Sequence, residues 1–224
     1  MASHLDLEEQ EQLEQLKAFW NRWGNLITGV VTLVVAVFAA WTGWNWWQRE
    51  QGVKASAMYA ELERVARAGD LEKTQQVFAD IKDRFAKTTY AGQAALVAAK
   101  LQADKGKADE ARATLTWATA QAQPNPLRDV ARLRLAGLHM DAKQYDEAAK
   151  ALDAIESADF AALQADRRGD LALLKAQPDQ AREQFKKAYT TLKAEDQYRR
   201  LVEVKLASLG VDAETLKSTE GAAK

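Results

Sequence analysis

The amino-acid sequence predicts an all-α protein, in which an N-terminal transmembrane helix precedes an α-solenoid of about four helical hairpins and a capping helix. Three observations predict this fold class. One uncharged segment near the N-terminus is long enough to cross a bilayer. A short pattern recurs at nearly constant spacing along the rest of the chain. The composition favours helices, because only three of the 224 residues are the helix breaker proline.

The uncharged segment extends from Trp23 to Gln48 and contains 26 residues. As a helix it would be about 39 Å long, which exceeds the roughly 30 Å hydrocarbon core of a bilayer. Tryptophans cluster at both ends, and indole rings favour the membrane interface. We therefore predict a transmembrane helix at residues 24–48, anchored by Trp20, Trp23, Trp41, Trp44, Trp46 and Trp47. A sugar- or cation-binding cage is the alternative use of these indoles, but their position at the two ends of the span favours anchoring.

Residues 1–23 are predicted to form an acidic, amphipathic N-terminal segment. Five acidic residues accompany only Lys17 and Arg22 in this segment. A cleaved signal peptide has instead a basic start, a shorter apolar core and a small-residue cleavage site, so we expect the span to remain in the mature protein. Arg49 and Lys54 balance the two basic residues on the other side of the span, and the positive-inside rule therefore gives no orientation.

The remainder of the chain carries four copies of one pattern. The copies are GDLEKTQQVF from Gly69, GKADEARATL from Gly106, KQYDEAAKAL from Lys143 and AQPDQAREQF from Ala176. Each consists of a turn, polar residues, a small residue and, four positions later, an apolar residue. The small residues lie 37, 37 and 33 positions apart, and the pairs are Thr74 with Phe78, Ala111 with Leu115, Ala148 with Leu152, and Ala181 with Phe185.

Helix-forming sequence precedes each turn, at residues 54–68, 90–105, 127–142 and 160–175, and a second helical stretch follows it. This arrangement, repeated every 33–37 residues, is typical of tetratricopeptide repeats. We therefore assign residues 49–210 to a tetratricopeptide-repeat-like (TPR-like) domain, with residues 195–209 as its capping helix, and residues 211–224 to a disordered tail. An irregular helical bundle with accidental spacing is the alternative. We also expect Asp70, Asp109 and Asn125 to cap helix N-termini.

The sequence gives no sign of catalysis. It has no cysteine and only two histidines, His4 and His139, and we expect His139 to be a packing residue. Because the motifs that bind zinc, dinucleotides and phosphates are missing, we predict no cofactor, no small-molecule substrate and no enzymatic activity. Residues 1–49 carry five of the 32 acidic and three of the 31 basic residues, which leaves 27 and 28 for the remainder. This balance argues against a nucleic-acid partner.

Several stretches carry a family resemblance. The acidic head is followed by LKAFWNRWGN, by a span that ends in GWNWW, and by a degenerate repeat domain. Within that domain, TTYAGQAALVAAK at residues 88–100 and LDAIESADFAALQADRRGDLALLK at residues 152–175 add to the likeness, above all the run from Asp166 to Asp170. In this order, the stretches resemble the YfgM-type family of ancillary SecYEG translocon subunits over nearly the whole chain.

The resemblance implies a single-pass protein of the bacterial inner membrane, with a cytoplasmic N-terminus and a periplasmic repeat domain. It also implies an adaptor that links the SecYEG translocon to a membrane-anchored periplasmic chaperone during protein secretion. A structural assembly factor of another envelope complex, for which the span is only a tether in the lipid bilayer, is the alternative.

The first helices of the repeats supply a candidate partner groove. In repeats of this kind their inner face lines the binding surface, and residues 127–142 carry a second apolar stripe besides the one that packs within the repeat. By register, the candidate groove residues are Leu96, Lys100, Leu133, Met140, Asp166 and Asp170. Alternatively, the second stripe packs against neighbouring repeats, and Leu133 and Met140 then belong to the core.

Overall fold

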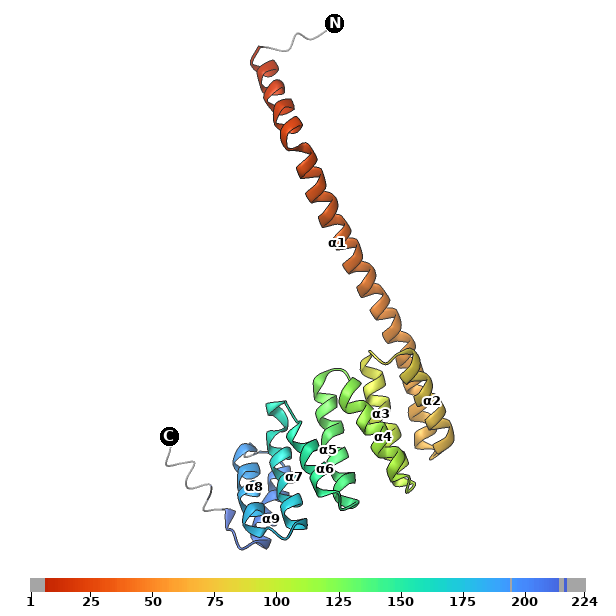
Figure 1. The fold of residues 1–224 in the computed structure, drawn as a ribbon, viewed down its shortest axis with the longest axis vertical. Coiled ribbons are helices and arrows are strands. Elements are labelled where there is room, and N and C mark those ends of the chain that lie inside the picture. Colours follow the sequence, from red (N-terminus) through yellow and green to blue (C-terminus); the bar gives the residue numbers. More distant parts are fainter. Residues whose placement is uncertain (1–6, 194, 214–215, 217–224) are drawn as a thin grey trace. The chain divides into compact units, whose positions relative to one another are not determined.

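The structure is a computed structural model that describes residues 7–193, 195–213 and 216. It divides into two compact units, residues 1–51 and residues 52–224. Over the residues that it describes, all regular elements are helices (Figure 1). The prediction of an all-α fold is confirmed.

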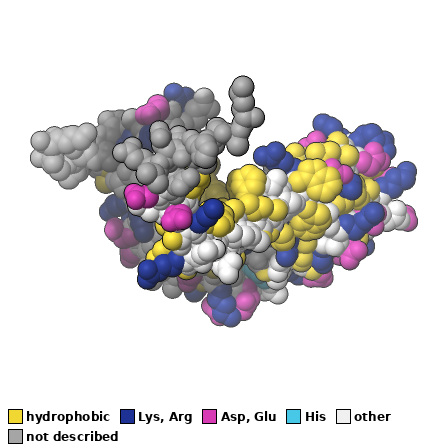
Figure 2. All heavy atoms as spheres, turned by 90° about the horizontal axis from the view of Figure 1, so that it is seen from above, with side chains coloured by type: hydrophobic (Ala, Val, Ile, Leu, Met, Phe, Trp, Pro, Cys, Tyr) yellow, Lys and Arg dark blue, Asp and Glu magenta, His cyan; other side chains and the backbone are white. Residues whose placement is uncertain are grey.

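The first unit consists of the N-terminal part of helix α1 (Leu7–Arg67). By length and composition, α1 is the one helix of the described chain that could cross a membrane. Its apolar side chains are exposed, for example Leu33 at 65% and Phe38 at 64%. Figure 2 shows hydrophobic side chains gathered over a continuous area of the surface, with charged side chains around it. Lipid or a partner has to cover apolar surface of this kind.

The second unit stacks its helices in chain order (Figure 1). The C-terminal part of α1 is followed by α2 (Leu71–Arg84), α3 (Thr89–Asp104), α4 (Ala108–Gln121), α5 (Asn125–Asp141), α6 (Tyr145–Asp153), a short 3-10 helix η1 (Ala158–Phe160), α7 (Ala161–Leu174), α8 (Pro178–Thr191) and α9 (Tyr198–Ser208). From α2 onward, helices that follow each other along the chain pack together, and α5 also contacts α3 and α7. Leu62 of α1 belongs to the same core cluster as Phe78 and Ile81 of α2. The helices α1, α3, α5 and α7 are therefore the first helices of four hairpins, and α9 is the cap.

The turns of the four hairpins have the same backbone structure. Each contains one residue with positive φ, namely Gly69 (71°), Gly106 (74°), Lys143 (58°) and Ala176 (55°). In every turn this residue donates its N–H to the carbonyl three positions back, and the next residue donates to the carbonyl five positions back. These bonds satisfy carbonyls at the end of the first helix. The backbone therefore repeats with the period that the sequence predicts.

The small and apolar positions of the repeat pattern lie in the core. The small residues Thr74, Ala111, Ala148 and Ala181 are fully buried, and their partners Phe78, Leu115, Leu152 and Phe185 are at most 7% exposed. A small side chain allows the second helix to approach the first closely. The closest approach is at Gly169 of α7, where an added Cβ would lie 2.6 Å from Cδ1 of Phe185.

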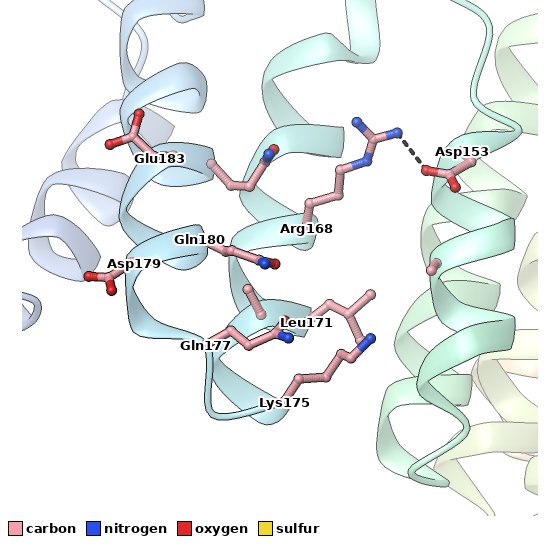
Figure 3. Close-up of a pocket in the computed structure, with 11 residues that line it drawn as sticks. Asp153, Arg168, Leu171, Lys175, Gln177, Asp179, Gln180 and Glu183 are labelled. Atoms are coloured by element: carbon pink, nitrogen blue, oxygen red, sulfur yellow. Dashed lines mark hydrogen bonds and ion pairs between the residues drawn. The ribbon is translucent and has the colours of Figure 1, made fainter.

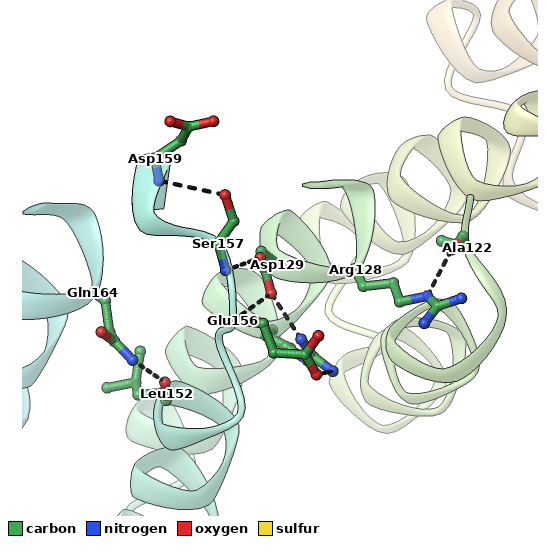
Figure 4. Close-up of polar contacts among 9 residues, drawn as sticks. Ala122, Arg128, Asp129, Leu152, Glu156, Ser157, Asp159 and Gln164 are labelled. Atoms are coloured by element: carbon green, nitrogen blue, oxygen red, sulfur yellow. Dashed lines mark hydrogen bonds and ion pairs between the residues drawn. The ribbon is translucent and has the colours of Figure 1, made fainter. Parts of the chain in front are cut away.

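A buried carboxylate holds the connection between α6 and α7. Asp129 of α5 is 1% exposed and accepts hydrogen bonds from the N–H groups of Glu156, at 3.3 Å, and Ser157, at 3.0 Å (Figure 4). Arg132 balances its charge at 2.8 Å. Gln164 of α7 donates to a carbonyl at the end of α6, that of Leu152, at 2.6 Å. The loop thus has a fixed path between the third and the fourth hairpin.

Two of the three predicted caps are wrong. Asp70 accepts a hydrogen bond from the N–H of Lys73, as expected. Asp109, however, lies inside the first turn of α4, where it pairs with Arg112, because α4 begins at Ala108 and its cap position belongs to Lys107. Asn125 is the first residue of α5, and the cap position before it belongs to a proline that has no side-chain oxygen.

Part of the stretch predicted as a disordered tail is packed. Ala213 is 4% exposed, and Val211 and Leu216 contact the cluster of buried residues that includes Phe185 and Leu206. These apolar side chains extend the core beyond α9. Residues 214–215 and 217–224 lie outside the described residues, as do residues 1–6 of the acidic segment.

Candidate protein-binding groove

Two hollows lie along the first helices of the repeats. The larger, of about 480 Å³, is formed by α5, α7 and Tyr198 at the start of α9. The smaller, of about 290 Å³, is formed by α3 and the last turns of α1. Both are lined by the row of helices that the sequence assigns to a groove.

The α5–α7 hollow is mainly apolar. Leu133 and Met140 line it from α5, and Gly137 between them leaves space, since no atom lies within 4 Å of the position of an added Cβ. The helix α7 contributes four residues at helical spacing, Leu163, Arg167, Asp170 and Leu174. Leu174 is 50% exposed and therefore offers apolar area to a partner.

A network of charges joins α9 to this hollow. Asp166 of α7 is fully buried and accepts hydrogen bonds from Oη of Tyr198, at 2.7 Å, and from Nζ of Lys205, at 2.8 Å. Lys205 also lies 2.7 Å from Asp170, to which Arg167 donates at 3.1 Å. Burial, and then the hydrogen bond to Asp166, raise the pKa of Tyr198. The two carboxylates thus hold the capping helix on α7.

The structure brings three of the six predicted groove residues together. Leu133, Met140 and Asp170 line the α5–α7 hollow. Lys100 lines the smaller hollow, where its ammonium group pairs with Asp104 at 2.6 Å. Leu96 is 8% exposed and packs in the core. Asp166 lies beneath the surface in the network described above.

Within the α5–α7 hollow, the residues differ in how much area they offer. Met140 is 7% exposed, and Leu133 packs against the cluster that contains it. This arrangement corresponds to the alternative in which the second stripe of α5 packs on neighbouring repeats. The lining also includes residues that the sequence did not predict, among them Leu163, Leu174 and Tyr198 and the charged Arg134 and Asp141. Leu174 follows Asp170 by one helical turn, so a step of four along α7 would have found it.

The six predicted anchor tryptophans have exposed side chains, from 45% for Trp23 and Trp47 to 67% for Trp46. The rings of Trp44 and Trp47 contact each other, with 5.4 Å between their centroids. Exposed indoles can reach lipid headgroups. Their role as membrane anchors stays a prediction.

Among the described residues, no three His, Asp or Glu side chains are close enough to hold a metal ion. Nδ1 of His139 lies 2.8 Å from the amide oxygen of Gln144, on the turn that follows α5. This histidine therefore has a local partner in the hairpin turn.

A comparison with protein families shows where the chain belongs. The family model of the tetratricopeptide repeat-like domain matches residues 17–211, a range that includes the candidate span as well as the repeats. The chain belongs to this tetratricopeptide repeat-like family. Similar solved structures agree with the fold of this TPR-like protein.

One such structure consists of nearly identical TPR-like repeats from Podosopora anserina. It has a TM-score of 0.53 and 15% identity, and the match covers 76% of this chain and 90% of that one. MamA from Desulfovibrio magneticus RS-1 has a TM-score of 0.51 and 17% identity, with 77% and 98% covered. At these identities the likeness shows the fold alone.

Two curated relatives share the name ancillary SecYEG translocon subunit. The protein of Escherichia coli (strain K12) is 38% identical over 96 residues, and that of Neisseria gonorrhoeae (strain ATCC 700825 / FA 1090) is 30% identical over 119 residues. The matches cover 43% and 53% of this chain, and 47% and 57% of the relatives. The matched part thus spans about half the length of the curated relatives. With the family match, these relatives confirm the YfgM-type resemblance seen in the sequence.

Proposed function

We propose that this TPR-like protein is a membrane-anchored, non-enzymatic adaptor that associates with the SecYEG translocon and binds protein partners through its repeats. The observation that carries the proposal is the similarity to two ancillary SecYEG translocon subunits. The family match supports it as well, because a single match joins the candidate span to the repeat domain.

The α5–α7 hollow is the proposed place of partner binding. Its lining is mainly apolar, and Leu174 leaves half of its side chain exposed. Burial of one leucine side chain contributes about 1.5–3 kcal/mol, which corresponds to roughly one to two decades of affinity. Arg167 and Asp170 on its edge already form ion pairs within the chain, and Arg134 donates to the carbonyl of Leu96. Beside them, the leucines of the lining suit an apolar side chain of a partner.

The proposal also includes a topology and a second partner. The N-terminus lies in the cytoplasm and the repeat domain in the periplasm, where the repeats meet a membrane-anchored chaperone of secreted chains. The family resemblance supports this arrangement. The exposed tryptophans on α1 support anchoring at both interfaces of the inner membrane.

Co-purification of the full chain from detergent-solubilised membranes tests the proposal. SecY, SecE and SecG are expected to co-purify with the wild type and with a variant whose residues 24–48 form an unrelated apolar span, if the repeats carry the contact. Loss of SecY, SecE and SecG from the sample of the variant with the replaced span would place the contact in the span. Absence of the translocon from both samples, with other envelope proteins enriched instead, would favour an assembly factor and contradict the proposal.

A further inference from the structure

A second cavity, of about 500 Å³, opens between α6, α7 and α8 (Figure 3). It shares no lining residue with the α5–α7 hollow. Ala149 of α6 and Ala172 of α7 line it with small side chains that leave room, and Leu171 adds apolar surface. This cavity therefore lies on a part of the repeat domain that the proposed groove does not use.

Amide side chains line one wall of the cavity. Gln177, Gln180 and Gln184 follow each other along the start of α8 at spacings of three and four residues. Figure 3 shows Gln177 and Gln180 pointing into the cavity, whose lining also includes Asp179 and Glu183 of the same helix. The side-chain oxygen of Gln184 is buried and has no hydrogen-bond partner in the described part of the chain. Because an amide both donates and accepts, this row matches the N–H and C=O groups of an extended backbone.

The charges around the cavity are paired, with one exception. Arg168 donates to Asp153 across the cavity at 2.6 Å (Figure 3). The carboxylates of α8 have partners on the same helix, since Asp179 pairs with Arg182 and Glu183 with Lys186. Lys175, at the end of α7, is exposed and forms no ion pair with any described residue. The cavity thus presents one positive charge that the chain does not balance.

We propose that this cavity binds an extended acidic segment of a partner protein. A carboxylate of the segment meets the ammonium group of Lys175, its backbone runs along Gln177 and Gln180, and a small apolar side chain contacts Leu171. The positive charge selects acidic over basic segments, because the remaining lining charges are already neutralised in pairs. This surface does not depend on the proposed translocon association.

The test uses the full chain in nanodiscs of uncharged lipid and three fluorescent peptides of equal length. One alternates Glu with Ala, the second replaces each Glu by Lys, and the third replaces each Glu by Gln. Fluorescence anisotropy should show binding of the Glu peptide, weaker binding of the Gln peptide and no binding of the Lys peptide. The variant Lys175→Glu is expected to lower the affinity for the Glu peptide about tenfold, which corresponds to about 1.4 kcal/mol.

Three further variants make the result specific. Lys187→Glu changes the net charge equally at an exposed position of α8 outside the cavity, and should bind like the wild type. Lys175→Arg keeps the charge and should also retain binding, whereas Ala149→Trp should fill the cavity and abolish it. A thermal midpoint measured for each variant identifies loss of folding.

Equal binding of the Glu and Lys peptides, or equal effects of Lys175→Glu and Lys187→Glu, would overturn the proposal. Loss of Glu-peptide binding in Leu174→Asp, but not in the other variants, would also overturn the proposal, since the peptide would then occupy the α5–α7 hollow.

Discussion

Gly169 of α7 belongs to the stretch that carries the family resemblance, and its contacts give it a physical role. An added Cβ would lie 2.6 Å from Cδ1 of Phe185, which is fully buried. We expect Gly169→Ala to lower the free energy of unfolding by about 1–3 kcal/mol, since overpacking forces the second helix outward. Gly137→Ala on α5 is the matched control. With open space around it, it should stabilise by about 0.5–1 kcal/mol through helix propensity. Urea unfolding of both variants measures the change in the free energy of unfolding. A change of the same sign in both would contradict the packing argument.

The left-handed turn residues differ in chemistry although their backbone is the same. Gly69 and Gly106 adopt positive φ without strain, whereas in Ala176 and Lys143 the Cβ atom comes too close to the following carbonyl oxygen and strains the backbone. We therefore expect Ala176→Gly to stabilise by about 0.5–1 kcal/mol, because the relief of about 1–2 kcal/mol exceeds the gain in unfolded-chain entropy of about 0.4–1 kcal/mol. Gly106→Ala should destabilise, with only backbone strain involved, since open space surrounds this glycine. A destabilised Ala176→Gly in urea unfolding would show that the turn tolerates alanine at no cost.

Tyr198 makes stability depend on alkaline pH. Burial and the hydrogen bond to Asp166 raise its pKa above the ordinary value, so the folded state favours the protonated phenol. The stabilisation that the protonated phenol gives to the folded state is fully present below the unfolded pKa of about 10. It is lost as pH rises through the higher folded pKa. Tyr198→Phe should lower stability by about 1 kcal/mol near neutral pH, through the lost hydrogen bond. It should also lose less stability than the wild type when urea unfolding is repeated between about pH 9 and 11. Parallel losses of stability in the two proteins would show that the pKa of Tyr198 is the same in the folded and the unfolded state.

At the scale of the element, α7 is the helix on which both candidate binding surfaces meet. Arg167, Asp170 and Leu174 line the α5–α7 hollow, and the next residue after each of them, Arg168, Leu171 and Lys175, lines the second cavity. A shift of one position along a helix turns the side chain by about 100°, because a turn contains 3.6 residues. The two surfaces can therefore be tested separately with substitutions on one helix.

Leu174 and Met140 should respond differently to a charge. Leu174→Asp is expected to weaken partner binding at the α5–α7 hollow about tenfold while the thermal midpoint stays near the wild-type value, because half of this side chain is exposed. Met140→Asp should instead lower the midpoint, since Met140 is 7% exposed and an unpaired carboxylate there costs several kcal/mol. Leu173→Asp is the control, because Leu173 is 40% exposed on the same helix and lies outside the hollow. Equal loss of binding in Leu173→Asp and Leu174→Asp would remove the hollow from the interface.

The repeat register could be predicted from the sequence because it depends on neighbours within one hairpin. Ala111 and Leu115, for instance, lie one helical turn apart and face the same partner helix. The groove could be predicted only in part, because exposure depends on how successive hairpins and the cap pack. Asp166 looks like a surface charge in the sequence, but its partner Lys205 lies 39 residues away on α9. No local pattern connects the two.

At the scale of the whole molecule, the chain combines a long exposed apolar helix segment with a repeat domain that has its own core clusters. The family match extends over both. Lipid or a partner has to cover an exposed apolar segment. Under the proposed function the segment spans the membrane, and the solenoid offers its protein-binding surface on one side of the lipid. The side on which the repeats lie therefore decides which partners they can meet.

Accessibility to trypsin tests the proposed topology. In Escherichia coli spheroplasts that contain the full chain, added trypsin should cleave the repeat domain, since Lys105 and Lys143 are exposed in hairpin turns. An epitope tag before Lys17 should stay intact until the membrane is lysed, because the proposed topology places the N-terminus in the cytoplasm. An endogenous cytoplasmic protein that survives the same treatment shows that the membrane is closed. Protection of the repeats until lysis, together with loss of the tag, would reverse the topology and place the repeats out of reach of any periplasmic chaperone.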